Sequence, residues 1–243
     1  MPSLSIIIPT LNEAAYLKQT LECLQLLEPL PSEIIVVDGG SVDDTVTIAK
    51  NYGTITIVSP LARRAIQMNQ GARTANGELL CFLHADTLVP QDLVTLIEKA
   101  LDNTQIACGG FISLMMGERK RWVTSFHNYL KTYYAPLLFR PHLFVLRGLR
   151  LLFGDQVMFC RRSDFWQCGG FDPNLPIMED ADLCLKLIEK GRIYLLHRLV
   201  RSSDRRVVKL GAIKANLIYF WVGFLWGLGV KAPYLKKFYP NIR

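Results

Sequence analysis

Three features are missing from this sequence: paired cysteines, low-complexity tracts and, in its first ten residues, the pattern of a signal peptide. Its six cysteines form no C-x-x-C pair, and most lie inside apolar runs, which argues against a disulfide framework or a common zinc site. No stretch is repetitive and 50% of the residues are hydrophobic, so we do not expect extended disorder. The first ten residues lack a basic region, a long apolar stretch and a cleavage site. We therefore expect no signal peptide and a cytoplasmic protein.

Acidic residues are scarce in the second half of the chain. The net charge is +7, and residues 118–150 contain seven basic side chains, Arg119 among them, against one acid. Residues 198–214 contain six basic side chains and the single acid Asp204. A solvated face explains such runs most simply, although phosphates, anionic lipid headgroups and nucleic acid would also suit them. Interleaved aromatic residues favour lipid, and without a recognised nucleic-acid module we expect no nucleic-acid partner.

The stretch 215–230 carries no charge at all. Its 16 residues fall short of the roughly 20 that a helix needs to span a bilayer. We predict an amphipathic or interfacial helix, anchored by Trp221 and Trp226, in peripheral contact with the inner face of the cell membrane. A helix packed on the core or on a second subunit explains the composition equally well.

The first hundred residues alternate between strand-like and helix-like segments. The strand-like runs are 4–8, 34–37, 54–58 and 79–83. We expect Pro9 to stop the first strand and Asn12 to cap the first helix. Ser41 and Asp44 have the spacing of a capping box for the second helix. Alternation with short joints predicts an α/β fold, with a mostly parallel central sheet and helices on both of its faces.

The second half is less regular. Strands are predicted at 108–114 and 157–160, where they can join the sheet antiparallel, and the basic segment between them is a helix or a mobile flap. A helix at 181–190 and a last strand at 192–196 follow.

We expect one domain over residues 1–210. Its nucleotide-binding half would cover 1–103 and its acceptor half 104–210. Residues 211–243 would form a hydrophobic and basic helical appendage.

Two acidic residues are expected at one rim of this sheet. Asp38 and Asp86 each follow a predicted strand, and ligands of such sheets lie beyond the carboxyl ends of the strands. A carboxylate such as Asp38 can bind ribose hydroxyls or the base. Asp86 can hold Mg²⁺ or Mn²⁺ together with phosphate and water, because these ions take few protein ligands. The metal would stabilise a leaving diphosphate as a Lewis acid.

Further charged side chains suit the same chemistry. Arg64, and Arg205 with Arg206, can form bidentate phosphate contacts. Asp180 or Glu179 can take the proton of an acceptor hydroxyl. Each of these signals alone has a structural explanation, since acidic residues in a first helical turn often only complement the helix dipole. Their combination at one rim favours transfer of a sugar from a nucleoside diphosphate over these structural explanations.

Four segments, quoted in chain order, carry a recognisable pattern: SIIIPTLNE (5–13), EIIVVDGGS (33–41) with Asp44 and Thr45, LHAD (83–86) and MEDADL (178–183). As a set they resemble a family 2 glycosyltransferase, which implies a GT-A fold, a three-layer sandwich. Residues 64–72, 154–156 and 203–206 are similar to a bacterial subgroup named the radical-SAM/selenodomain-associated transferases. The resemblance runs in matching order from about Ser5 to the C-terminus.

The resemblance implies a role for individual residues. Those implied to contact the nucleotide-sugar are Pro9, Thr10, Glu13 and Asp38 on the nucleoside, and Arg64, Gln67 and Asn69 near the nucleotide or diphosphate. Asp86 matches the last aspartate of the metal-binding D-x-D motif, and Asp180 matches the base of the E-D motif. Asp155 lies where the acceptor or donor sugar is expected. The implied reaction inverts the anomeric carbon of a UDP- or GDP-sugar.

Two positions depart from the family pattern. His84 stands where D-x-D has its first aspartate, which leaves a single carboxylate for the metal. Arg63 stands where the subgroup is expected to have glycine, which bears on how closely the backbone approaches a ligand there.

Two other functions remain open. A sugar-phosphate nucleotidyltransferase shares the sheet, although residues 10–13 contain no glycine-rich basic loop. A non-catalytic, membrane-associated nucleotide-sugar-binding protein would account for the missing aspartate. The acceptor is equally open, since a lipid-linked sugar, a small glycoside or a secondary metabolite would all satisfy this sequence.

Overall fold

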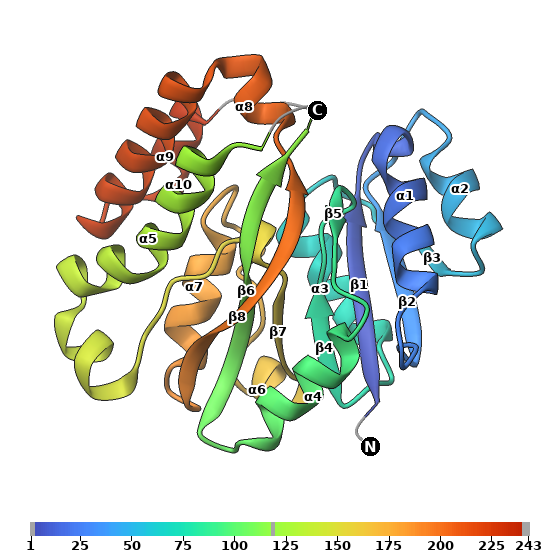
Figure 1. Cartoon of the computed structure of the whole chain (residues 1–243), viewed down its shortest axis with the longest axis horizontal. Helices are drawn as coiled ribbons and strands as arrows, with labels where there is room; N and C mark the ends of the chain where they lie inside the picture. The colour runs from blue at the N-terminus through green and yellow to red at the C-terminus, as the bar shows by residue number, and fades with distance from the viewer. Residues whose placement is uncertain (1–2, 118–119, 240–243) are drawn as a thin grey trace.

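The computed structural model describes residues 3–117 and 120–239; Arg119 of the basic segment and residues 240–243 of the predicted appendage lie outside them. An eight-stranded sheet of order β3-β2-β1-β4-β7-β6-β8-β5 crosses the molecule (Figure 1). Its strands are β1 (Leu4–Thr10), β2 (Glu33–Asp38), β3 (Ile55–Val58), β4 (Leu79–Phe82), β5 (Thr87–Leu88), β6 (Ile106–Met116), β7 (Met158–Arg161) and β8 (Arg192–Ser203).

The sheet is mixed: among the described strands parallel pairings predominate, as expected, and antiparallel pairings accompany them. The strands β3, β2, β1 and β4 run parallel to one another. β7 then pairs antiparallel with both β4 and β6, and β5 pairs antiparallel with β8. The nucleotide-binding half predicted for residues 1–103 thus contributes four consecutive parallel strands, and the antiparallel pairings of β4 with β7 and of β5 with β8 join it to the second half.

Helices cover both faces of the sheet, as the alternating pattern predicts. One face packs on α3 (Arg64–Thr74), α6 (Arg162–Gln167) and α7 (Glu179–Leu187), and the other on α1 (Ala14–Gln25), α2 (Thr45–Asn51) and α4 (Leu93–Asp102). β1 shows the alternation directly, because Ile7 lies in the first of these cores and Ile6 and Ile8 in the second. The three-layer α/β arrangement is confirmed.

Pro9 does not stop the first strand. β1 continues to Thr10, with Pro9 paired in register with Val37 of β2. The register of β1 with β4 ends at Ile7 and Phe82, so Pro9 has a strand neighbour on one side only. A proline without an N–H donor is tolerated at such an edge-like position.

Both predicted capping arrangements are absent from the helix starts. α1 begins after Glu13, and the side-chain oxygen of Asn12 instead accepts a hydrogen bond from the N–H of Val42. α2 begins after Asp44 without a side-chain cap, and the hydroxyl of Ser41 bonds the carboxylate of Asp38. These polar side chains therefore tie neighbouring loops together at the carboxyl ends of β1 and β2.

The basic segment of the second half is a helix and not a flap. α5 (Trp122–Phe139) is followed by a single π-helical turn, η1 (Leu143–Arg147), and a 3₁₀ turn, η2 (Gly154–Gln156). The last strand, β8, has 12 residues and extends well past the predicted end at 196. It runs parallel to β6 almost along its whole length.

The chain closes with the helices α8 (Arg205–Leu210), α9 (Ala212–Gly227) and α10 (Ala232–Leu235) and the turn η3 (Lys236–Phe238). α9 packs alongside α5, where Gly227 lies against the ring of Phe139 and Asn216 bonds His127 and Thr124. Both helices lie on the left of Figure 1. No described helix combines the length and the apolar character needed to cross a membrane.

Candidate active site

A pocket of about 340 Å³ lies at the carboxyl ends of β1 and β4. Its wall includes the predicted residues Pro9, Thr10, Glu13, Arg64, Gln67, Asp86, Asp155, Glu179, Asp180, Arg205 and Arg206. Because these come from both halves of the chain and from α8, the fold brings together side chains nearly 200 positions apart. A larger hollow of about 680 Å³ lies beside Glu78 and Arg161, and it contains none of the predicted residues.

Asp38 lies behind this wall and organises the loop after β2. Its buried carboxylate accepts hydrogen bonds from the N–H groups of Gly40 (2.8 Å) and Ser41 (2.7 Å) and from the hydroxyl of Thr10 (3.1 Å). Gln67 joins the same two strands, since its side-chain NH₂ donates to the carbonyls of Thr10 (2.7 Å) and Val37 (2.8 Å). Together they fix the ends of β1 and β2.

Asn69 is not brought into the pocket wall. Its amide forms a pair of hydrogen bonds with the backbone of Phe171, donating to the carbonyl at 2.7 Å and accepting from the N–H at 3.0 Å. This pairing holds α3 to the loop before α7. Arg63 precedes α3 in an extended conformation that any residue adopts, so the backbone there does not require glycine.

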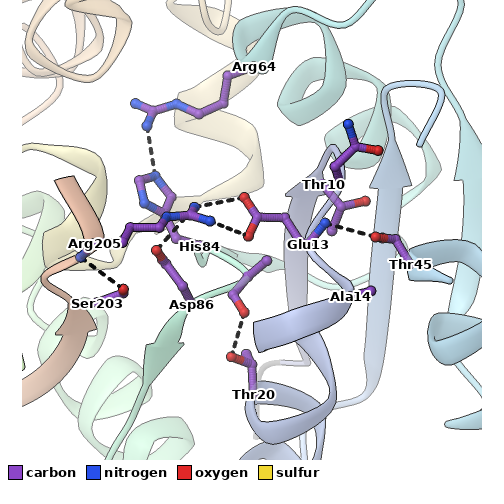
Figure 2. A network of polar contacts seen from close by, with 12 residues as sticks. Thr10, Glu13, Ala14, Thr20, Thr45, Arg64, His84, Asp86, Ser203 and Arg205 are labelled. Carbon is purple, nitrogen blue, oxygen red and sulfur yellow. Dashed lines mark hydrogen bonds and ion pairs between the residues drawn. The ribbon is translucent and has the colours of Figure 1, made fainter. Parts of the chain in front are cut away.

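Arg64 links three predicted residues into one cluster. Its Nε donates to Glu179 at 2.7 Å, and its Nη2 pairs with Asp180. Its Nη1 lies 2.8 Å from Nε2 of His84, as Figure 2 shows. Burial, reinforced by Arg64 and Arg205, holds the pKa of His84 well below its usual range. His84 is therefore neutral, and because a guanidinium only donates, Nε2 is the acceptor and Nδ1 carries the proton.

Asp180 is an unusually basic carboxylate. Its side chain is 8% exposed, and burial raises its pKa to about 7, with Glu179 adding to the rise and Arg64 opposing it. A carboxylate with a pKa near neutrality can accept a proton during catalysis at physiological pH. The physical conditions for a general base are met at this position.

Arg205 joins two further acidic residues of the pocket, Glu13 and Asp86. Its guanidinium forms a bidentate pair with Glu13, at 2.8 and 2.7 Å, and its Nη2 lies 3.2 Å from Oδ2 of Asp86 (Figure 2). The pairing of β5 with β8 makes this possible, because the N–H of Ser203 donates to the carbonyl of Asp86 at 3.2 Å. Burial raises the pKa of Asp86 to about 6, and Arg205 opposes that rise.

Several pocket residues carried no signal in the sequence. Asn128 of α5 donates to Asp155 at 2.6 Å, and Lys131, one turn further, places its ammonium 3.5 Å from the ring centre of Phe153. Tyr219 of α9 completes this wall. The aromatic run around Lys131 resembles any amphipathic helix, so only the fold shows that α5 and α9 face the pocket.

Asp86 is a suitable but incomplete metal site. Across 3–117 and 120–239, no three His, Cys, Asp or Glu side chains group closely enough to hold a metal ion. Asp86 and Glu13 are hard oxygen donors that already share one cation, Nη2 of Arg205. Mg²⁺ and Mn²⁺ accept such oxygens and complete their shell with phosphate and water. The residues fit a metal that is held jointly with a diphosphate.

A family model for glycosyl transferase family 2 matches residues 5–169. The chain belongs to this family, and the fold and the pocket described above agree with a glycosyltransferase. An uncharacterized glycosyltransferase of Rickettsia typhi is 27% identical over 236 residues, which cover 92% of this chain and 72% of the relative. A PGL/p-HBAD biosynthesis glycosyltransferase of Mycobacterium tuberculosis is 40% identical over 91 residues, 35% of this chain and 36% of the relative.

Solved structures share the fold at low sequence identity. Glucosyl-3-phosphoglycerate synthase from Mycobacterium tuberculosis, in complex with Mn²⁺, UDP and phosphoglyceric acid, aligns with a TM-score of 0.66 at 19% identity and covers 94% of this chain and 79% of its own. The mannosyltransferase PcManGT from Pyrobaculum calidifontis, in complex with GDP-Man and Mn²⁺, aligns with a TM-score of 0.68 at 21% identity. The alignment covers 96% of this chain and 66% of the mannosyltransferase.

Proposed function

We propose that this glycosyltransferase moves a sugar from a UDP- or GDP-sugar to an acceptor hydroxyl, with inversion at the anomeric carbon. The observation that carries the proposal is that one pocket holds the basic carboxylate Asp180, paired with Arg64, together with Arg205, which is paired with Asp86. The nucleotides and Mn²⁺ bound to the two solved structures support the donor class.

In the proposed reaction Asp180 accepts the proton of the acceptor hydroxyl. The hydroxyl oxygen then bonds the anomeric carbon while the bond from that carbon to the diphosphate oxygen breaks on the opposite face. Glu179 stays paired with Arg64, and this ion pair places the positive charge of Arg64 beside the reacting atoms. Arg64 and Arg205 contribute to binding the negative diphosphate through the positive charge that they bring to the pocket.

The nucleoside end of the donor would lie against Pro9, Thr10 and Glu13. Asp38 and Gln67 maintain the shape of that end by holding the loop after β2. Asp86 would hold Mn²⁺ or Mg²⁺ jointly with the diphosphate. The metal, when bound, supplies Lewis-acid neutralisation of the leaving group. Metal affinity without nucleotide should be low, because Asp86 has no second carboxylate at position 84.

We infer that the chain belongs to the radical-SAM/selenodomain-associated subgroup of the family. The three segments that resemble the subgroup contribute Arg64, Asp155 and Arg205 to a single pocket, which supports a shared substrate chemistry. We also propose a cytoplasmic protein in which residues 1–210 form the transferase and 211–243 add a helical cover.

Peripheral membrane contact is part of the proposal. α5, η1 and α9 carry a set of exposed apolar side chains, here called the apolar face. They include Trp122, Phe126, Leu138, Leu146, Ile213, Leu217 and Trp221. Exposed basic residues, Lys120, Arg140, Lys214 and Lys231, accompany it. Charge of one sign beside large apolar side chains favours an anionic lipid surface. Trp226 packs inward against the core, so Trp221 is the anchor of the two predicted tryptophans.

Turnover and binding test the proposal together. A panel of UDP- and GDP-sugars is incubated with the protein and Mn²⁺, and release of nucleoside diphosphate is measured. We expect a chelator or Asp86→Asn to abolish metal-dependent nucleotide binding. Asp180→Asn should lower kcat by roughly 10²- to 10⁴-fold, the usual value of base catalysis, while the dissociation constant of the nucleotide changes little.

Asp182→Asn is the matched control, because Asp182 lies on the same helix and pairs with Lys186 at 2.8 Å. It should retain near-normal kcat. Turnover by Asp180→Asn at the rate of the control would contradict the assignment of the base. Tight nucleotide-sugar binding without transfer or hydrolysis would indicate a non-catalytic binding protein, and pyrophosphate release from nucleoside triphosphate and sugar phosphate would indicate a nucleotidyltransferase.

A further inference from the structure

Two basic side chains of the pocket take no part in the proposed transfer step. Lys131 of α5 is buried, and its ammonium faces the rings of Phe153, at 3.5 Å, and Tyr219, at 5.7 Å. Burial lowers its pKa to about 8, and Asp155 opposes that change, so the group is mainly protonated at neutral pH. Within the described residues Lys131 forms no ion pair at salt-bridge distance.

Arg206 is the second of these side chains. Its guanidinium carbon lies 4.1 Å from the ring centre of Tyr239. Its Nη1 is buried and, as far as the structure describes the chain, has no hydrogen-bond partner. A buried donor without a partner costs free energy, and an anionic oxygen of a ligand would satisfy it.

The two cations share one aromatic wall. The rings of Tyr219 and Tyr239 have centres 6.2 Å apart, with Lys131 beside the first and Arg206 on the second. An aromatic face attracts a cation without occupying its N–H donors. The donors of Lys131 and Arg206 therefore stay available, in contrast to those of Arg205, which bind Glu13 and Asp86.

This wall adjoins the proposed base. Lys131, Asp155 and Asp180 all line this one pocket, and Asp155 acts electrostatically on the other two. An acceptor that presents its hydroxyl to Asp180 has the remainder of its structure beside the aromatic wall.

We propose that Lys131 and Arg206 bind an anionic group of the acceptor, a phosphate or a carboxylate, so that the acceptor is a negatively charged hydroxyl compound. The inference rests on the proposed function and deepens it. It also reassigns Arg206, which the sequence predicts for the donor diphosphate, to the acceptor. Two cations that have no ion-pair partner among residues 3–117 and 120–239, set in a partly buried wall, can bind such an oxyanion by charge-assisted hydrogen bonds.

The test uses inorganic phosphate and acetate as probes of the full chain. Each is titrated calorimetrically into protein saturated with UDP or GDP and Mn²⁺, at pH 7 and low ionic strength. We expect saturable binding of phosphate, acetate or both, and the preferred probe identifies the acceptor anion. Lys131→Met and Arg206→Met should each weaken that binding at least tenfold and leave the nucleotide dissociation constant within about twofold, since one charge-assisted bond contributes at least a factor of ten.

Lys214→Met is the matched control, because Lys214 is an exposed lysine of α9, and it should bind the probes as the unchanged protein does. If Arg206→Met fails to fold, Arg206→Lys and Lys131→Gln keep the side-chain volume and still test the site. Binding of neither probe, or probe binding unaffected by every variant, would overturn the inference. Equal loss of probe and nucleotide affinity would also overturn it and return both cations to the donor.

The two proposals fail separately. Absence of nucleotide binding in the unchanged protein refutes the proposed donor, whereas nucleotide binding without probe binding refutes only the anionic acceptor. A transfer assay then compares phosphorylated sugars with their uncharged parents. We expect Lys131→Met to raise KM for the phosphorylated acceptor tenfold or more, and equal use of both acceptors would contradict the inference.

Discussion

Asp180 sets the pH dependence at the scale of single residues. Its carboxyl must be ionised to accept a proton, and its pKa is raised to about 7, so kcat/KM should rise with pH through about 7 and level off above it. Arg64 favours the ionised form. Arg64→Gln should therefore shift this rise of kcat/KM, the acidic limb of the profile, to higher pH. A pH profile of kcat/KM measures the shift even when the rate itself is low.

Arg73→Gln serves as the control for this shift, because Arg73 is an exposed arginine at the far end of the same helix. Its profile should match that of the unchanged protein. An acidic limb that stays in place in Arg64→Gln would mean that a group other than Asp180 titrates.

The sequence identifies most of the charged residues of this pocket and few of their partners. Asp180, Asp86 and the arginines were predicted at one rim because strand ends and helix starts are visible in local patterns. The pairing of Arg205 with Glu13 depends on the contact between β5 and β8, which no local pattern specifies. Asn69 was implied for the nucleotide and instead bonds the backbone of Phe171.

The short turn η2 controls the site at the scale of elements. A Cβ atom at Gly154 would collide with Nε2 of His84 and lie 2.9 Å from Nη1 of Arg64. Gly154→Ala should therefore displace the Arg64 cluster and lower kcat/KM on the order of 100-fold, as misplacement by about 1 Å can. Transfer kinetics measure this loss, and a thermal unfolding midpoint shows whether the variant is folded.

Gly223→Ala is the folding control, since a Cβ there meets nothing within 4 Å. Its unfolding midpoint should equal or exceed that of the unchanged protein, because alanine suits a helix better than glycine. If Gly154→Ala retains full activity, the close approach of η2 to His84 is not needed for catalysis.

In the mixed sheet, the strands of the first half can be predicted from the sequence, but the directions of the later strands cannot. The first four strands follow from short apolar runs between helices, and their parallel order follows from the crossover helices. β6, β7 and β8 come from distant segments, and their directions are fixed by long-range pairing such as that of Cys81 with Phe159. Pro9 was wrongly predicted to end β1. The strand tolerates this proline because β4 stops pairing with β1 at Ile7, and the residues around Pro9 in the sequence do not reveal where that pairing stops.

At the scale of the whole molecule, the C-terminal helices both cover the pocket and form the apolar face. Tyr219 and Val222 of α9 line the pocket, whereas Ile213 and Trp221 are 81% and 54% exposed. Deleting residues 215–243 would remove part of the pocket together with the proposed membrane contact. Point substitutions on the apolar face separate the two roles, because exposed side chains contribute little to stability.

The double variant Ile213→Ser/Trp221→Ser tests the membrane contact. The unchanged protein should co-sediment with vesicles of phosphatidylcholine and phosphatidylserine, more weakly with phosphatidylcholine alone, and less as salt rises. The double variant should lose at least tenfold in partition coefficient while its unfolding midpoint and nucleotide affinity stay the same. Val42→Ser, on a 93% exposed apolar residue outside the apolar face, should partition normally.

Two outcomes would contradict membrane contact through this face. If the double variant partitions as the unchanged protein does, the apolar face does not meet the bilayer. If the substitutions instead abolish a concentration-dependent dimer in sedimentation analysis, the face binds a second copy of the chain. A bilayer is the favoured occupant because the exposed lysines Lys120, Lys214 and Lys231 lie within or next to α5 and α9 in the chain. Like charges on two copies of the chain would repel each other, whereas an anionic surface would attract them.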